Sequence, residues 1–436
     1  MEKKRTINLG FRGWMLLIYQ FIAFFTFIIF TNWPMNILAD FFGGAQKIST
    51  IYTFATLVGI VFQLIFSRFV GRIKNIKVVG VIFGFITLLF GLAIMLIPMT
   101  MPTLWQVAYF FLTLFSTIYC TLLIGILVGQ WFPRRKGTIM GIATIAFPIG
   151  NGLLGTFAGL VFAPGGSVFN AFLPFFIICA VGLLIGAIFV KDYPEQCGAF
   201  RDNDRSITPE VGKAMMEHEI EAKRTSVWGL RHTLGTRDFW FMVIPMGALL
   251  MCAVGMMTQS MSIVANQDIL DFNTVMLAVM VVACVGSWLL GVLDTKFGTK
   301  KAIAISVVIM ITSGILGTVK TGPTLLVALI LLSLFMGASS NFTVSAAAQY
   351  WRREDFPRVF SYVNPTANII QAIGPMMVAY LMAAKDYSLA FTVTAVIGVV
   401  SLILILSFSS KHVKEKDDKY RTAAGKTLDD ALVGRK

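Results

Sequence analysis

Residues 78–98 of the chain read VVGVIFGFITLLFGLAIMLIP, a run of 21 residues without a charged side chain. A helix of about 20 apolar residues is long enough to cross the hydrocarbon core of a bilayer, which is about 30 Å thick. Eleven other apolar runs of similar length occur along the chain. The twelve predicted spans are 13–33, 48–67, 78–98, 104–131, 138–163, 169–190, 239–264, 272–293, 301–319, 324–348, 358–382 and 387–409. The sequence therefore predicts an all-α membrane protein with twelve transmembrane helices.

The composition excludes a water-soluble fold. Hydrophobic residues make up 57% of the 436 positions and charged residues only 13%, whereas soluble domains contain about 45–50% apolar and about 25% charged residues. The five cysteines show no C-x-x-C spacing, which argues against a disulfide framework or a metal site. We expect neither a metal nor a cofactor.

The positions of lysine and arginine predict the orientation. With the N-terminus placed in the cytoplasm, 33 of the 36 basic residues fall in cytoplasmic segments, and only Lys47, Lys320 and Lys385 fall outside them. Such a bias places both termini of a multi-pass protein in the cytoplasm. This bias also explains the net charge of +14 without a nucleic-acid partner. The expected partner is the lipid bilayer of the cytoplasmic membrane.

The two halves of the sequence resemble each other. Gly71 and Gly298 lie in similar basic loops 227 positions apart, and the Gln-Trp-Phe at 130–132 matches the Gln-Tyr-Trp at 349–351. Six helices per half in the same orientation are typical of a parallel repeat. We expect a six-helix bundle over 1–190, a cytoplasmic loop over 191–237, a second six-helix bundle over 238–410 and a disordered cytoplasmic tail over 411–436.

Three loop motifs carry a resemblance to a known family. Residues 291–301, GVLDTKFGTKK, resemble the signature loop of the major facilitator superfamily. Residues 131–137, WFPRRKG, and 193–203, YPEQCGAFRDN, resemble the oxalate/formate antiporter family, which is close to the monocarboxylate porters. The resemblance implies the major facilitator fold and transport by alternating access. It also implies a gating loop in which an acid and bases hold the cytoplasmic helix ends together, here Asp294, Lys296, Gly298 and Lys300.

The predicted spans contain no Asp, Glu, Lys or Arg near their centres, and the three histidines lie in predicted cytoplasmic segments. Ionisable residues inside a membrane are expensive and usually functional, so their absence predicts an uncharged translocation route. Oxalate transporters of the resembled family have basic residues in helices 8 and 11. Here 275–293 and 359–384 contain none, which argues against oxalate as the substrate.

Neutral polar side chains are the candidate binding residues. Ser361, Asn364, Asn368 and Gln371 follow spacings of 3, 4 and 3 and therefore share one helix face. Such a stripe faces either a substrate cavity or a neighbouring helix to which it hydrogen-bonds. The other candidates are Tyr19, Gln20, Tyr119, Asn151, Gln259, Trp288 and Asn341, for each of which packing between helices is the alternative.

The leading functional prediction is a monomeric secondary transporter, an antiporter or a symporter. It would move a small organic anion, a monocarboxylate above all, with a counter-substrate or a proton as a second partner. One alternative is a transporter of amphipathic or drug-like solutes, and a non-transport alternative is a membrane sensor. The spans contain no H-E-x-x-H spacing or phosphate loop, so we expect no enzymatic activity.

Overall fold

The computed structural model describes residues 9–67, 75–132, 136–265, 271–352 and 355–426, apart from 205, 207, 209, 215, 216, 218–220 and 222–225. The basic loop 68–74 and the centre of the WFPRRKG motif, 133–135, lie outside the described residues. Within the described part, twelve helical segments are long and apolar enough to span a membrane, which confirms the predicted fold class. The first of them, Gly10–Phe42, extends well beyond the predicted span 13–33.

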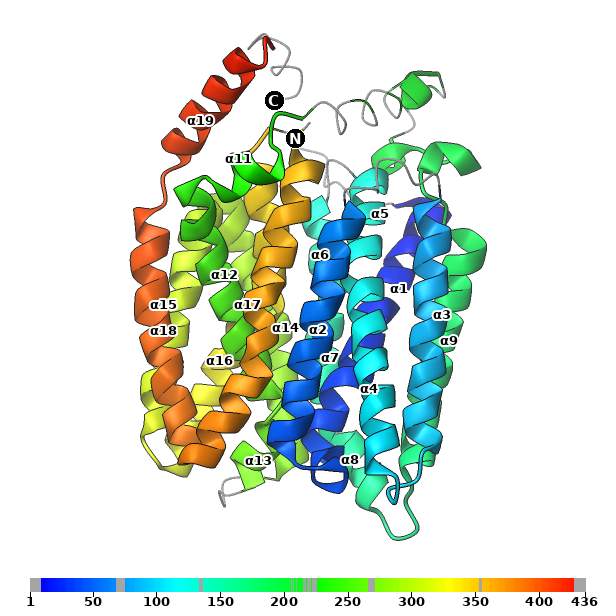
Figure 1. Ribbon diagram of the computed structural model, residues 1–436, viewed down its shortest axis with the longest axis vertical. Coiled ribbons are helices and arrows are strands. Elements are labelled where there is room, and N and C mark those ends of the chain that lie inside the picture. Colours follow the sequence, from blue (N-terminus) through cyan, green and yellow to red (C-terminus); the bar gives the residue numbers. More distant parts are fainter. Residues whose placement is uncertain are drawn as a thin grey trace, which may run out of the picture.

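The helices form two groups that lie side by side (Figure 1). The first group comprises α1 (Gly10–Phe27) with η1 (Ile28–Asn32), η2 (Pro34–Leu38) and η3 (Ala39–Phe42), α2 (Ala45–Ser67), α3 (Ile76–Leu96), α4 (Pro102–Thr117) with η5 (Ile118–Leu123) and α5 (Ile124–Trp131), α6 (Lys136–Thr144), α7 (Ala146–Gly152), α8 (Leu154–Phe162) and α9 (Val168–Phe189). The second comprises α12 (Arg237–Met257) with α13 (Ser260–Ala265), α14 (Phe272–Phe297), α15 (Thr299–Thr318), α16 (Gly322–Tyr350), α17 (Phe356–Ala384) and α18 (Tyr387–Ser407). The start of α1 and the last helix, α19 (Ser410–Ala423), lie at the same end of the molecule, here called the terminal end. The opposite end is called the far end.

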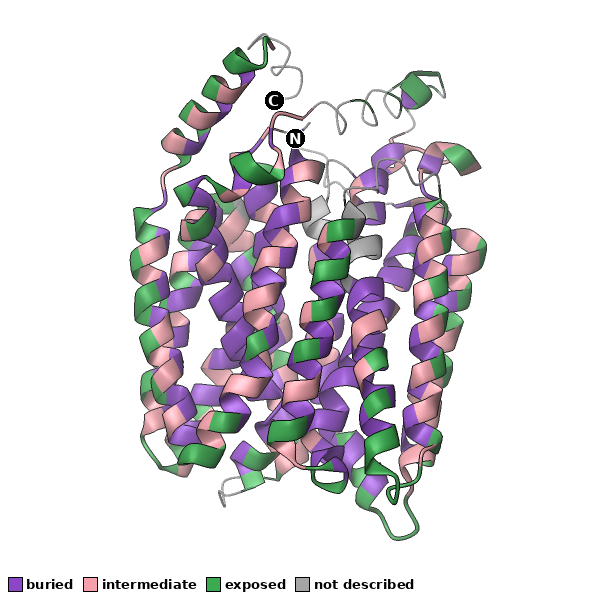
Figure 2. Ribbon diagram, in the orientation of Figure 1, coloured by how far each residue is buried: buried purple, intermediate pink, exposed green. Residues whose placement is uncertain are grey.

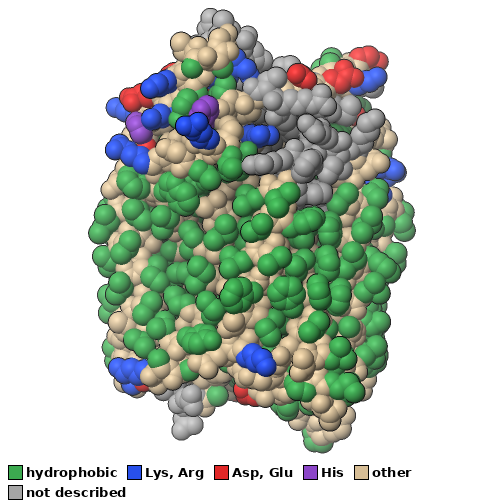
Figure 3. Space-filling model, in the orientation of Figure 1, with side chains coloured by type: hydrophobic (Ala, Val, Ile, Leu, Met, Phe, Trp, Pro, Cys, Tyr) green, Lys and Arg blue, Asp and Glu red, His purple; other side chains and the backbone are tan. Residues whose placement is uncertain are grey.

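On the face shown in Figure 3, apolar side chains form a band across the middle of the molecule, and the charged side chains gather at its two ends. Exposed and half-buried residues face outward, while buried residues line the inside of each group (Figure 2). Exposed large side chains such as Phe85 (56%) and Ile188 (63%) would cost free energy in water. The band is therefore the surface that contacts lipid.

The three lysines outside the predicted cytoplasmic segments lie at the far end. Lys320 pairs with Asp386, which also caps α18 by accepting a hydrogen bond from the backbone N–H of Ser388 at 2.9 Å. These hydrogen bonds, the one from Lys320 first, hold the pKa of Asp386 at about 2.

The two groups meet where α2 packs on α17, α7 and α8 pack on α14, and α6 packs on α16. Glycine allows the close approach to α14, because a Cβ on Gly152 would lie 2.4 Å from the Cβ of Met280. Small residues at such contacts are typical of membrane helices, which have no hydrophobic effect to drive their association.

Hydrogen bonds join the two groups toward the far end. Asn36 donates to the carbonyl of Met257 at 3.0 Å and accepts from the hydroxyl of Ser260 at 3.2 Å. The hydroxyl of Thr53 donates to the carbonyl of Ala372 at 2.7 Å. These bonds close the interface on the far side of the membrane centre.

The tail corrects one sequence prediction. Residues 411–423, expected to be disordered, belong to helix α19, whereas 427–436 lie outside the described residues. The helix is anchored by Arg421, which is 2% exposed and pairs with Asp355 and Asp417. Sequence composition suggested disorder because this segment has few apolar residues, but ion pairs to distant parts of the chain add to the packing of Val413 and Tyr420.

Candidate functional site

A cavity lies between the two groups of helices and contains about 980 Å³ of empty space, its open mouth included. It runs from the middle of the membrane toward the terminal end, where Met140 and Phe360 stand one turn from the starts of α6 and α17. The lining residues are Phe24, Phe27, Ile28, Asn32, Thr56, Thr117, Cys120, Met140, Thr144, Phe147, Asn151, Leu250, Val254, Met257, Met336, Ser340, Thr343, Val344, Phe360, Asn364, Asn368 and Gln371.

None of these described lining residues is an Asp, Glu, Lys, Arg or His. The cavity therefore offers a solute amide groups, hydroxyls, thioethers, a thiol and aromatic rings. A small number of placed polar groups in a mostly apolar pocket is the usual composition of a ligand site.

Helix α17 contributes the largest set of polar groups. Asn364, Asn368 and Gln371 line the cavity from one face of this helix, as their spacing requires. Asn364 accepts a hydrogen bond from the hydroxyl of Thr343 on α16 at 3.3 Å. Within the described part of the chain, neither Asn368 nor Gln371 has a side-chain hydrogen-bond partner, so both amides remain available to a solute. The first residue of the predicted stripe, Ser361, donates instead to the carbonyl of Arg358.

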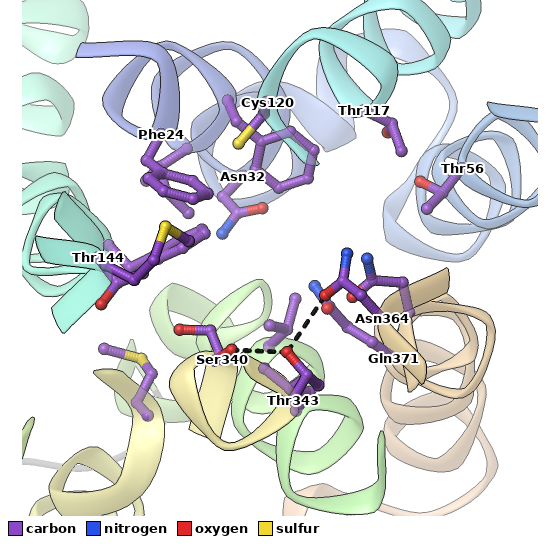
Figure 4. A pocket seen from close by; sticks show the side chains of 18 of the residues that line it. Phe24, Asn32, Thr56, Thr117, Cys120, Thr144, Ser340, Thr343, Asn364 and Gln371 are labelled. Atoms are coloured by element: carbon purple, nitrogen blue, oxygen red, sulfur yellow. Dashed lines mark hydrogen bonds between the residues drawn. The ribbon is translucent and has the colours of Figure 1, made fainter. Parts of the chain in front are cut away.

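The first group of helices contributes polar groups from the opposite side. Asn151 donates to the carbonyl of Phe147 at 3.1 Å, and its side-chain oxygen has no partner. Thr144 and Asn151 stand 220 positions before Asn364 and Gln371, so the two halves place polar residues at equivalent points around the cavity. Figure 4 shows Thr144 and Asn364 on different sides of the space.

Of the eleven polar residues named as binding candidates, the structure brings four together in the cavity. These are Asn151, Asn364, Asn368 and Gln371. Asn341 lies next to the cavity, where it accepts a hydrogen bond from Thr144 at 3.2 Å.

The remaining candidates lie elsewhere. Gln259 donates to the hydroxyl of Ser49 at 3.2 Å and thereby joins the two groups. The rings of Tyr19 and Tyr119 contact each other inside the first group, with centroids 6.0 Å apart. Gln20 is fully buried, and neither amide atom has a partner.

Trp288 corrects the sequence prediction. Its side chain is 69% exposed on the outer apolar surface, on the same stripe of α14 as Val281 and Val285. The inward face of α14 belongs to residues such as Gly286, where a Cβ would lie 2.1 Å from the carbonyl oxygen of Leu334. The spacing 281, 285, 288 was present in the sequence and marks the lipid-facing side.

Sequence reasoning missed several lining residues. Asn32 is the clearest of them, because Phe24, Ile28 and Asn32 follow spacings of 4 and all line the cavity. Its helix becomes π-helical at η1, and π-helical turns often occur at functional sites. The spacing of Asn32 from Phe24 and Ile28 could have indicated in the sequence that the three residues share one helix face. No charge or motif marked the hydroxyls of Thr56, Thr117, Ser340 and Thr343.

The predicted gating loop joins helix ends at the terminal end. Asp294 accepts from the hydroxyl of Thr299 at 2.6 Å, and Gly298 has a φ of 87°, which favours glycine. Lys300 donates to the carbonyls of Leu406 and Phe408 at the end of α18, at 2.9 and 2.7 Å. A cation at a helix C-terminus is stabilising. Lys296 is exposed.

Comparison with known proteins agrees with this geometry. Residues 15–293 and 268–432 match the model of the family described as Major Facilitator Superfamily. Solved structures of similar fold include the proton:xylose symporter XylE bound to 6-bromo-6-deoxy-D-glucose, with a TM-score of 0.69 and 12% identity over 93% of this chain and 98% of that chain. They also include the E. coli fucose:proton symporter FucP, with a TM-score of 0.58 and 14% identity over 90% of this chain and 98% of that chain. At these identities the likeness shows the fold. No curated protein matches the chain at a significant level.

Proposed function

The chain belongs to the major facilitator superfamily of membrane transporters, and from that premise we propose that it is a secondary transporter of a small monocarboxylate. The solute binds in the central cavity and crosses the membrane by alternating access. Transport runs as exchange with a second solute or together with a proton.

The observation that supports this proposal is a neutral cavity with free amide groups on one helix. Each amide of Asn368 and Gln371 supplies two N–H donors, and a hydrogen bond to a charged group contributes about 1.5–3 kcal/mol. A single carboxylate can be held in this way. A dianion would lose far more hydration free energy without a positive charge to offset it.

The absence of acids and histidines among the described lining residues bears on coupling. XylE and FucP are proton symporters. In this chain no described lining residue of the cavity has a side chain that changes its charge near neutral pH. We therefore propose that the coupled proton, where there is one, travels on the carboxylate of the solute.

The excess of Lys and Arg at the terminal end supports a cytoplasmic location for that end. The cavity extends toward it, while hydrogen bonds of Asn36 and Thr53 close the far side. On this proposal the structure corresponds to a state that is closed to the outside.

The test is counterflow in liposomes. The purified protein is reconstituted with unlabelled monocarboxylate inside, and uptake of labelled monocarboxylate, oxalate and xylose is followed. We expect saturable counterflow of the monocarboxylate and none of the other two. The absence of monocarboxylate counterflow, with uptake of another solute, would contradict the proposal.

A further inference from the structure

The polar groups of the cavity are distributed unevenly. One side, here called the polar wall, consists of Thr56, Thr117, Asn364, Asn368 and Gln371, from α2, α4 and α17. Helix α2 packs directly on α17, so these five residues form one continuous surface. Figure 4 shows Thr56, Thr117, Asn364 and Gln371 on the same side of the space.

The other side, here called the aromatic wall, consists of Phe24, Phe27, Met140 and Phe147, from α1, α6 and α7. The rings of Phe24 and Phe147 contact each other, with centroids 5.1 Å apart and planes inclined by 45°. Phe24 lies across the space from Gln371 in Figure 4.

Two of the polar residues near the aromatic wall, Asn151 and Thr144, have no free donor to offer an anion. The amide nitrogen of Asn151 already donates to the carbonyl of Phe147, so only its oxygen remains free there. The hydroxyl of Thr144 is within hydrogen-bond distance of Gly141 and Asn341. The faces of aromatic rings are also electron-rich. A carboxylate is therefore bound better at the free amides of the polar wall than over the ring faces of the aromatic wall.

Building on the proposed function, we propose that the solute is an amphipathic monocarboxylate. Its carboxylate binds the polar wall, at the amides of Asn368 and Gln371, and its apolar chain or ring lies on the aromatic wall. Formate and acetate lack the part that the second wall binds. A sugar would leave hydroxyl groups unpaired against Phe24 and Phe147, at a cost in binding free energy.

This substrate class predicts a dependence of affinity on chain length. Burial of one CH₂ group contributes about 0.8 kcal/mol, or a factor of about four in the dissociation constant. We expect the affinity to rise about fourfold per CH₂ group from acetate to hexanoate, and 3-phenylpropionate to bind at least as tightly as hexanoate.

The first experiment measures binding of this series to the purified wild-type protein by calorimetry. Binding is preferred to flux, because longer acids in their neutral form cross bilayers unaided. Hexanol, with the same tail and no carboxylate, controls for partition into detergent and is expected to bind at least tenfold more weakly than hexanoate. Equal affinity for acetate and hexanoate would overturn the inference, as would equal affinity for hexanol and hexanoate.

Two variants separate the walls. Phe147→Ala is expected to reduce the ratio of hexanoate to acetate affinity about tenfold or more, whereas Asn368→Leu is expected to weaken both acids and keep their ratio. Phe85→Ala, on the lipid-facing surface, is the matched control for loss of a phenyl ring. An unchanged ratio in Phe147→Ala would contradict the place assigned to the tail. If no carboxylic acid binds, the proposed function fails; if acids bind without a chain-length dependence, only this inference fails.

Discussion

Asn368 is the residue on which the binding proposal depends most directly. The residue is 9% exposed and lines the cavity, and its amide has no partner in the described part of the chain. Loss of a hydrogen bond to a charged group costs about 1.5–3 kcal/mol. In counterflow assays we expect Asn368→Leu to raise the half-saturation concentration of the monocarboxylate at least several-fold. Asn170→Leu, exposed at the far end, is the control, and an unaltered value in the cavity variant would remove Asn368 from the site.

A second single residue, Gln20, has a buried amide that is left without a partner. It lies one turn before Phe24 on α1, fully buried, and both amide atoms lack a partner. An unsatisfied buried polar group costs about 1–3 kcal/mol. We expect Gln20→Met to raise the unfolding temperature and to lower turnover, because the amide meets water or solute only after the helices move. A variant that is stabilised but transports at the wild-type rate would show that the amide has no part in transport.

At the scale of a single helix, we expect transport to require that α17 bends. Helix α17 contains Pro365 and Pro375 on either side of Asn368 and Gln371, and proline inside a helix removes a hydrogen bond and permits a kink. We expect Pro375→Ala to slow turnover several-fold while substrate affinity is retained. Pro174→Ala in α9, away from the cavity, is the matched control. Equal turnover in the two variants would argue against a hinge in α17.

Helix α19 is held by a network that its own sequence does not reveal. Asp417 accepts from the indole nitrogen of Trp228 at 2.8 Å, while Arg421 bridges Asp417 and Asp355 at the start of α17. Removal of one partner from a buried ion pair typically costs about 3–5 kcal/mol. The tail helix can avoid this cost only by leaving its site.

Arg421→Gln is therefore expected to undock α19. Limited trypsinolysis is the measurement, since α19 contains several lysines, and cleavage between 411 and 419 should accelerate at least about tenfold. Lys414→Gln, on the exposed face, should cleave at the remaining lysines at the wild-type rate. Equal protection of both variants would show that the ion pairs do not hold the helix.

The orientation in the membrane is a property of the whole molecule, because it follows from the summed charges at its two ends. We expect Pro164→Cys, in the exposed loop between α8 and α9, to react with a membrane-impermeant maleimide in intact cells. A C-terminal epitope tag should become accessible only after permeabilisation. Cys197, at the terminal end, provides the internal control, since the wild-type protein should remain unlabelled. Labelling from the opposite side would reverse the proposed topology.

At the scale of the whole molecule, some site residues could be predicted from their spacing in the sequence and others could not. The α17 stripe was readable, because residues three and four apart on a helix share a face whatever its surroundings. Trp288 was misassigned because polarity was weighed without the lipid-facing stripe of Val281 and Val285. Gln259 is polar and deep, yet its partner Ser49 lies 210 positions away, and no local pattern contains that information.

The sequence by itself determined the twelve spans, because length and hydropathy are local properties that a bilayer selects directly. It also determined that the spans contain no charge near their centres. Only the tertiary structure decided which neutral groups meet: Asn364 with Thr343, Phe24 with Phe147, Arg421 with Asp355. In lipid, helix association depends on shape and on individual hydrogen bonds rather than on hydrophobicity, so the faces that meet are settled by packing across the whole fold.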